Sequence, residues 1–206
     1  MPKVKNTKVE LKAQMDALKR FQRFLPMLLL KKQQLQVEVA TILAQVEELH
    51  GRELARIEGM SGWVALFADE QLPDDLVVVD RVVTEAGNIA GVPIPLFRKL
   101  ETHTKALDLF MTPSWYDEAS ASVADLLALR AEAAVLEEQR RRIVDELRST
   151  SQRVNLFEKV KIPECRENIR IIRIALGDEQ TAGVARGKIA KRRSEREADD
   201  EEEAAA

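Results

Sequence analysis

The sequence predicts a mainly α-helical protein. We expect its N- and C-terminal helices to form a long antiparallel two-helix coiled coil, with an insert of a small β-hairpin plus a short helix at one end. Charged residues make up 33% of the 206 residues and aromatic residues only 4%, which is typical of long helices. Apolar residues recur at heptad spacing in two long segments, and a β-branched stretch punctuated by Gly and Pro separates them.

The first long helix is predicted over residues 1–60. Ten of the twelve a and d heptad positions between residues 11 and 49 are apolar, and such a stripe needs a partner helix along its whole length. Pro26 lies inside this pattern at a cost of roughly 3 kcal/mol, which a long seam can absorb. The predicted seam residues are Leu11, Leu18, Phe21, Leu25, Leu28, Leu35, Val39, Ile42, Val46 and Leu49.

Residues 61–116 are predicted to form the insert. Its β-branched stretch 76–86 is followed by NIAGVPIPLF, and together they predict a hairpin over about 76–97 with a tight turn at Gly87–Asn88. Prolines at 93 and 95 restrict the second strand to a sheet edge. The following segment RKLETHTKALDLF predicts a short helix, and Pro113 with Ser114 supplies a stop and an N-cap before the next helix.

The second long helix is predicted over residues 117–192, kinked near Pro163. Beyond this proline the apolar stripe resumes one residue out of its earlier phase, which favours a bend over an end. The remaining residues, 193–206, predict a charged flexible tail. The predicted seam residues are Leu126, Leu129, Leu136, Ile143, Leu147, Val154, Phe157, Ile162, Ile169, Ile172 and Leu176, with breaks at Arg140 and Thr150.

Few residues in the sequence indicate chemistry. His50 and His103 stand far apart without ligand-spaced neighbours, so we expect no metal site. The segment GVARGK lacks the spacing of a phosphate-binding loop. Cys165 occupies a seam-like position and is predicted to be a small buried hydrophobic residue. We therefore expect a non-catalytic chain without cofactors.

Charge and hydropathy favour a cytoplasmic chain. The net charge is only −3, and no apolar run is long enough to span a bilayer, so we expect neither nucleic-acid binding nor direct membrane insertion. No secretory signal follows Met1, and a single cysteine fits a reducing compartment. The N-terminal cations Lys3, Lys5, Lys8 and Lys12 form one basic end, and a second basic cluster at 186–196 precedes the acidic tail.

Three stretches, in order, carry a resemblance to a known family. They are VELKAQMDALKRFQRFLPMLLLKKQQLQ, the hairpin phrase NIAGVPIPLF, and QRVNLFEKVKIPECRENIRIIRIAL. The chain resembles the D subunit of the V-type (A/V-type) ATPases, the central rotor shaft, over nearly all of residues 8–192. The most specific matches are Arg153, Val154, Asn155, Glu158, Ile162, Pro163 and Asn168.

The resemblance implies a mechanism and a set of partners. In this family the paired terminal helices enter a hexamer of alternating catalytic (A) and regulatory (B) subunits. The shaft transmits torque between that hexamer and the membrane ring that translocates ions. It works with the small central-stalk F subunit and a funnel-like subunit on the ring, which implies a peripheral location on the membrane. We expect Lys3, Lys5, Lys8 and Lys12 to contact acidic surfaces of the hexamer.

Three other classes of protein fit parts of the sequence. The γ shaft of F-type ATP synthases has similar terminal helices, but it carries a much larger α/β insert than the 55 or so residues available here. A structural coiled-coil tethering protein would explain the heptads but not the hairpin phrase. A helical nucleic-acid binder would use the basic ends, whereas the interspersed carboxylates disfavour it.

Overall fold

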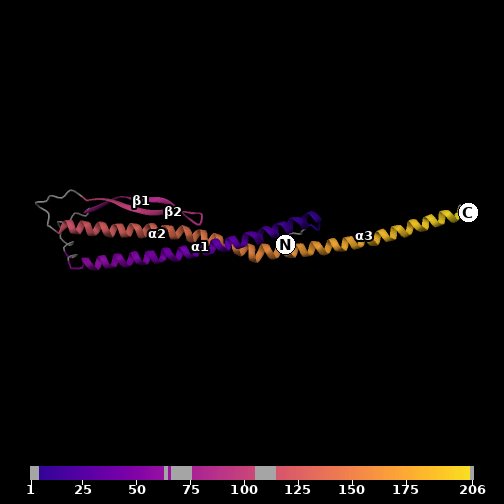
Figure 1. Ribbon diagram of the computed structural model, residues 1–206, viewed down its shortest axis with the longest axis horizontal. Coiled ribbons are helices and arrows are strands. Elements are labelled where there is room, and N and C mark those ends of the chain that lie inside the picture. The colour runs from indigo at the N-terminus through magenta and orange to yellow at the C-terminus, as the bar shows by residue number, and fades with distance from the viewer. Residues whose placement is uncertain (1–4, 63–64, 66–75, 105–114, 205–206) are drawn as a thin grey trace. The chain divides into compact units, whose positions relative to one another are not determined.

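The computed structural model describes residues 5–62, 65, 76–104 and 115–204, with side-chain exposure up to residue 196. The elements, in order, are α1 (Lys8–Met60), β1 (Val77–Ile89), β2 (Val92–Thr104), α2 (Tyr116–Leu156), the π-helical segment η2 (Phe157–Lys161) and α3 (Ile162–Ala204) (Figure 1). They form two compact units. Met1–Leu29 with Gln152–Ala206 is the terminal unit, and Leu30–Ser151 is the central unit. The predicted mainly α-helical fold with an antiparallel hairpin is confirmed.

Helix α1 begins at a side-chain cap and contains Pro26 and Gly51, two residues that disfavour helix. The hydroxyl Oγ1 of Thr7 accepts a hydrogen bond of 3.2 Å from the backbone N–H of Glu10, which satisfies one of the free amides of the first turn. The helix continues through Pro26 and Gly51 and ends at Met60. The low helix propensity of Pro26 and Gly51 therefore does not end the helix.

The central unit pairs the C-terminal part of α1 with α2 in antiparallel direction. Lys31, near the start of this part, pairs with Glu146 at 2.6 Å, and Arg56, near its end, pairs with Asp125 at 2.6 Å. The hairpin lies along the helices (Figure 1), and its turn end contributes to their core. The buried core residues are Leu35, Ile42, Val46, Val92, Ile94 and Ile143.

The hairpin turn lies three residues after the predicted position. The strands pair from Val77↔Thr104 to Ile89↔Val92, so Ala90 and Gly91 form the two-residue turn. Both have positive φ, 50° and 83°, as the type I′ geometry favoured in hairpins requires. The prediction of a turn at Gly87–Asn88 was wrong because Asn88 instead supports the turn: its Oδ1 accepts a 2.9 Å hydrogen bond from the N–H of Gly91.

The predicted short helix after the hairpin was wrong over its first half. Residues 98–104 belong to β2, and residues 105–110 lie outside the described part, as do Pro113 and Ser114. Cross-strand ion pairs hold this segment extended: Arg81 Nε lies 2.5 Å from a Glu101 carboxylate oxygen, and Arg98 pairs with Glu85. Pairing with β1 thus overrides the helical pattern of RKLETHTKALDLF.

In the terminal unit, a π-helical segment precedes Pro163 and explains the shifted stripe. The N–H of Ile162 donates to the carbonyl of Phe157, five residues back, and not four. A π-helical turn accommodates one extra residue, so the apolar positions on either side of it share one face despite the one-residue shift. The sequence analysis ascribed this shift to a kink at Pro163. In the structure the extra residue lies in the segment before it, and Pro163 is the second residue of α3.

Helix α3 continues to Ala204 without a break near residue 192. The predicted tail at 193–206 is therefore helical to residue 204. Within the terminal unit α3 extends past the first turn of α1 (Figure 1), and residues 177–196 are all exposed. This part of α3 has no covering helix among the described residues.

We expect the turn glycine and a helix glycine to respond with opposite sign to the same substitution. Gly91→Ala should lower the free energy of unfolding by about 1 kcal/mol, because an L-residue at positive φ is strained. Gly51→Ala should raise it by about 1 kcal/mol, since alanine is the better helix former and a Cβ there meets nothing within 4 Å. Urea unfolding followed by circular dichroism measures both. Equal effects of the two changes would contradict the turn assignment.

Deleting Val160 should be harmful only while Pro163 is present. Val160 is an exposed residue of the π-helical segment, and its deletion should convert the segment to α-helix. That change places the proline inside regular helix at a cost of about 3 kcal/mol. With Pro163→Ala the same deletion should be nearly neutral, because the seam stays in phase. A double-mutant cycle of unfolding free energies measures the coupling, and no coupling between the two changes would rule out this explanation.

Candidate functional site

The predicted seam residues of the central unit lie on its covered side. Of these, Leu35, Ile42, Val46, Leu49 and Ile143 are buried. The half-buried ones are Val39, Leu126, Leu129, Leu136 and Leu147. The exposed residues of α2 in this unit are mostly charged. The exposed side of α1 is mixed, and it also carries the apolar residues Val37, Leu43, Leu54 and Ile57.

The seam of the terminal unit has the same character. Here Val154, Ile162, Ile169 and Ile172 are buried. The half-buried ones are Leu11, Leu18, Phe21, Leu25, Leu28, Phe157 and Leu176. The rings of Phe21 and Phe157 lie 4.9 Å apart between centroids. Cys165 is also buried, and burial raises the pKa of its thiol, which fits a packing residue better than a nucleophile.

One polar residue in the apolar seam has no partner among the described residues. Thr150 is 1% exposed, and its Oγ1 makes no hydrogen bond there. The heptad count treated this residue only as a break, whereas the structure buries it fully. A buried polar group in a coiled-coil seam typically reduces stability and favours one register over others.

The hairpin is anchored to α2 by a buried glutamine that the sequence analysis missed. Gln139 is 5% exposed, and its Nε2 donates a 2.7 Å hydrogen bond to the carbonyl of Pro95. Arg142 reaches the carbonyl of Pro93 at 3.4 Å. Prolines have no N–H, so at these two positions the strand offers acceptors alone. The alternating prolines were a partial signal: they mark an edge of the strand that cannot donate and that presents carbonyl acceptors.

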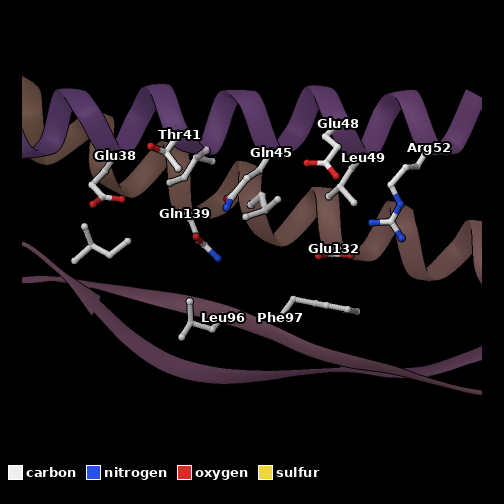
Figure 2. A pocket seen from close by; sticks show the side chains of 13 residues that line it. Glu38, Thr41, Gln45, Glu48, Leu49, Arg52, Leu96, Phe97, Glu132 and Gln139 are labelled. Carbon is white, nitrogen blue, oxygen red and sulfur yellow. The ribbon is translucent and has the colours of Figure 1, made fainter.

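A cleft of about 480 Å³ lies between the helix pair and the hairpin of the central unit. Figure 2 shows Glu38, Gln45 and Arg52 extending from α1, with Leu96 and Phe97 on the hairpin opposite. The lining mixes carboxylates, amides and apolar side chains from three elements. Its carboxylates, Glu38, Glu48 and Glu132, form no ion pair with described residues. The described residues also hold no group of three His, Cys, Asp or Glu that could bind a metal.

The residues of the family-like motif are mostly at the surface. Arg153, Asn155, Glu158 and Pro163 are exposed, and Asn168 is half-buried. Within this motif Val154 packs in the seam. The motif therefore combines seam packing with an exposed polar surface next to the π-helical segment.

The basic ends are solvent-exposed where they are described. Lys5, Lys8 and Lys12 are exposed, and Lys3 lies outside the described residues. The second cluster on α3 is exposed as well: Arg186, Lys188, Lys191, Arg192, Arg193 and Arg196. The two histidines have carboxylate neighbours: His103 Nδ1 lies 2.8 Å from Asp80 Oδ1, and His50 Nδ1 lies 3.5 Å from Glu53 Oε2.

Removing the buried amide should loosen the hairpin. Gln139→Ala leaves the carbonyl of Pro95 without its donor, so we expect a loss of about 1–3 kcal/mol in stability and faster hydrogen exchange in β1 and β2. Gln45→Ala is the matched control, because Gln45 lines the same cleft from α1 but is exposed. Equal exchange rates in the two variants would show that Gln139 does not anchor the hairpin.

The cross-strand pair of Arg81 and Glu101 should make the hairpin sensitive to acid. Hydrogen bonds from Arg81 and then Lys99 lower the pKa of Glu101 from 4.5 to about 2. A carboxyl group with a lowered folded-state pKa stabilises above its unfolded pKa and loses that effect as the pH falls through the folded value. The stability advantage of the wild type over Glu101→Gln should therefore shrink as the pH falls from 4.5 to about 2. Thermal unfolding of both proteins across this range measures it, and a pH-independent difference would contradict the ion pair.

None of the helices in the described ranges has an apolar stretch long enough to span a bilayer.

Comparison with known proteins assigns the chain to a family. The family model for the D subunit of ATP synthase matches residues 10–192. The chain is 44% identical over 193 residues to the V-type ATP synthase D subunit of Borreliella burgdorferi, covering 93% of this chain and 95% of the relative. It is 32% identical over 203 residues to the protein of the same name from Chlamydia abortus, covering 97% of both chains. The continuous match across both helices and the hairpin shows that the chain belongs to the ATP synthase D-subunit family.

Proposed function

We propose that this chain is the central-stalk subunit, or rotor shaft, of a V/A-type rotary ATPase. It transmits torque between a hexamer of catalytic A and regulatory B subunits and the membrane ring that translocates ions. Its further partners are the small central-stalk F subunit and a funnel-like subunit on the ring. The chain performs no catalytic step itself. It is cytoplasmic, and the other subunits of the complex hold it at the membrane surface.

The observation that carries this proposal is the paired-helix seam in each unit. A shaft has to resist twisting, and close-packed apolar seams transmit strain because protein interiors have low compressibility. Fully buried residues occur along the seam in both units, for example Ile143 in the central unit and Ile172 in the terminal unit. Ion pairs between α1 and α2 add cross-links in the central unit, at Lys31–Glu146 and Arg130–Glu53.

The exposed end of α3 supports the insertion of the terminal helices into a surrounding sleeve. Residues 177–196 are exposed throughout, and they include the apolar side chains Val184 and Ile189, each 62% exposed. Helical stability in proteins comes mostly from packing, so a surrounding surface would stabilise this uncovered segment. The basic residues of this segment and of the N-terminal end allow charge attraction to acidic walls at many rotational positions.

Co-purification tests the proposal. A tagged chain expressed in its own cells should recover the A and B subunits together with the F subunit. Neutralising Lys3, Lys5, Lys8 and Lys12 together with Gln should reduce recovery of the hexamer. A double variant with Lys8→Gln and Lys12→Gln should lower hexamer recovery. The matched control is a double variant with Arg52→Gln and Arg148→Gln, which removes the same charge from the central unit and should leave recovery unchanged. Recovery of neither the hexamer nor the F subunit by the wild-type chain would overturn the assignment.

A further inference from the structure

The hairpin of the central unit is attached to the helices at both of its ends. At the turn end, Val92 and Ile94 belong to the core that they share with α1 and α2. At the open end, the buried Leu76, directly before β1, packs with Tyr116 and Ala119 at the start of α2. The middle of the hairpin lies between these two anchors and borders the cleft of about 480 Å³.

The pairing of the two strands is irregular in this middle part. The register shifts twice, so that Asp80 on β1 and Arg98 on β2 have no paired residue on the opposite strand. Such bulges disrupt the hydrogen-bond ladder locally and bend the strand that contains them. The hairpin can therefore bend here while both of its anchors stay in place.

Apolar side chains line both walls of the cleft. Leu96 and Phe97 lie on the hairpin, and Ile42, Leu49 and Leu136 lie on the helices opposite (Figure 2). Leu96 remains 38% exposed. Protein interiors are close-packed, and closure of the cleft would remove apolar surface from water. The two walls therefore favour a closed hairpin.

Negative charge on the helices opposes this closure. Glu38 and Glu48 on α1 and Glu132 on α2 line the cleft, and none of them forms an ion pair with a described residue. Arg52 is the one cation among the described lining residues, and the hairpin residues in the lining are uncharged. Closure would take the carboxylates out of water without supplying an opposite charge from the hairpin, which costs free energy.

We propose that the hairpin is a pH-sensitive strap, open over the cleft while these three glutamates are ionised and closed onto the helix pair once they are protonated. Protonation removes the cost of burying the carboxylates, and apolar contact between the walls then holds the strap down. The charges beside the bulge leave this balance unchanged, because Arg98 pairs with Glu85 on the other strand. The strap belongs to this chain alone and does not depend on the proposed torque transmission.

Pulsed electron paramagnetic resonance of two spin labels on the full-length chain measures the closure. The labels are attached to Leu43→Cys on α1 and Val82→Cys on β1, both exposed positions, and Cys165→Ala removes the native thiol. The cleft variant combines three changes: Glu38→Gln, Glu48→Gln and Glu132→Gln. At neutral pH its label-to-label distance should be shorter than that of the wild type by roughly 3 Å, the thickness of one layer of water.

Acid should have the same effect on the wild type only. Lowering the pH to about 4, where glutamates begin to protonate, should shorten the wild-type distance and leave the cleft variant unchanged. The matched control neutralises three exposed carboxylates of the same helices that do not line the cleft, through Glu47→Gln, Glu58→Gln and Asp145→Asn. It should keep the wild-type distance at neutral pH. Circular dichroism of each variant shows that its helices remain folded.

Equal distances in the wild type and the cleft variant at neutral pH would overturn the proposal, as would an equal shortening in the control variant. Acid that shortens the distance equally in the wild type and the cleft variant would also overturn it, because groups outside the cleft would then be the cause. None of these outcomes bears on the recovery of the A, B and F subunits. The strap can therefore fail while the proposed function stands.

Discussion

The structure depends on one constraint: an apolar stripe that recurs every three to four residues along a helix needs cover along its whole length. Neither long helix can meet this alone, since each would leave its seam in water at roughly 25 cal/mol per Å² of exposed apolar surface. Antiparallel pairing covers part of this surface in both units, and it does so without a large globular core. The exposed face of α2 is mostly charged, whereas α1 also exposes apolar residues such as Val37 and Leu54.

Two local departures from regular geometry serve this constraint. The π-helical segment Phe157–Lys161 absorbs an extra residue, so that Val154 and Ile162 both remain buried on the seam. The hairpin extends the core sideways: Val92 and Ile94 pack against Ile42 and Ile143. The amide of the buried Gln139 then donates a hydrogen bond to the carbonyl of Pro95 and ties β2 to α2. In both places backbone hydrogen bonding adapts to side-chain packing.

The helices could be predicted from the sequence because their evidence is periodic and extends over many residues. The seam positions follow from counting heptads, and single residues such as Pro26 do not cancel the pattern. The turn position and the extent of β2 could not be predicted so well. Gly87 and Gly91 are equally plausible turn residues locally, and only strand register places the turn at Ala90–Gly91. Likewise, residues 98–104 have helical periodicity but pair with β1 through cross-strand contacts.

The candidate surfaces were less predictable than the fold, for a physical reason. The basic ends are visible in sequence because the charges cluster along the chain. The contact between Gln139 and Pro95 forms only after the hairpin packs on α2. Heptad counting identifies the covered side of a helix, but not which charged residues lie beside an uncovered apolar patch. The one-residue shift of the apolar stripe was visible in the sequence. Its cause, the hydrogen bond from the N–H of Ile162 to the carbonyl of Phe157, was not.

Rotation of this chain within its complex tests the account most directly. The complex is immobilised through the hexamer, and a bead is attached to Val82→Cys, an exposed position on β1; Cys165 is buried and competes little for the label. With ATP present, the account predicts stepwise rotation of the bead in one direction. ATP hydrolysis by the intact complex with no rotation of the bead would contradict it.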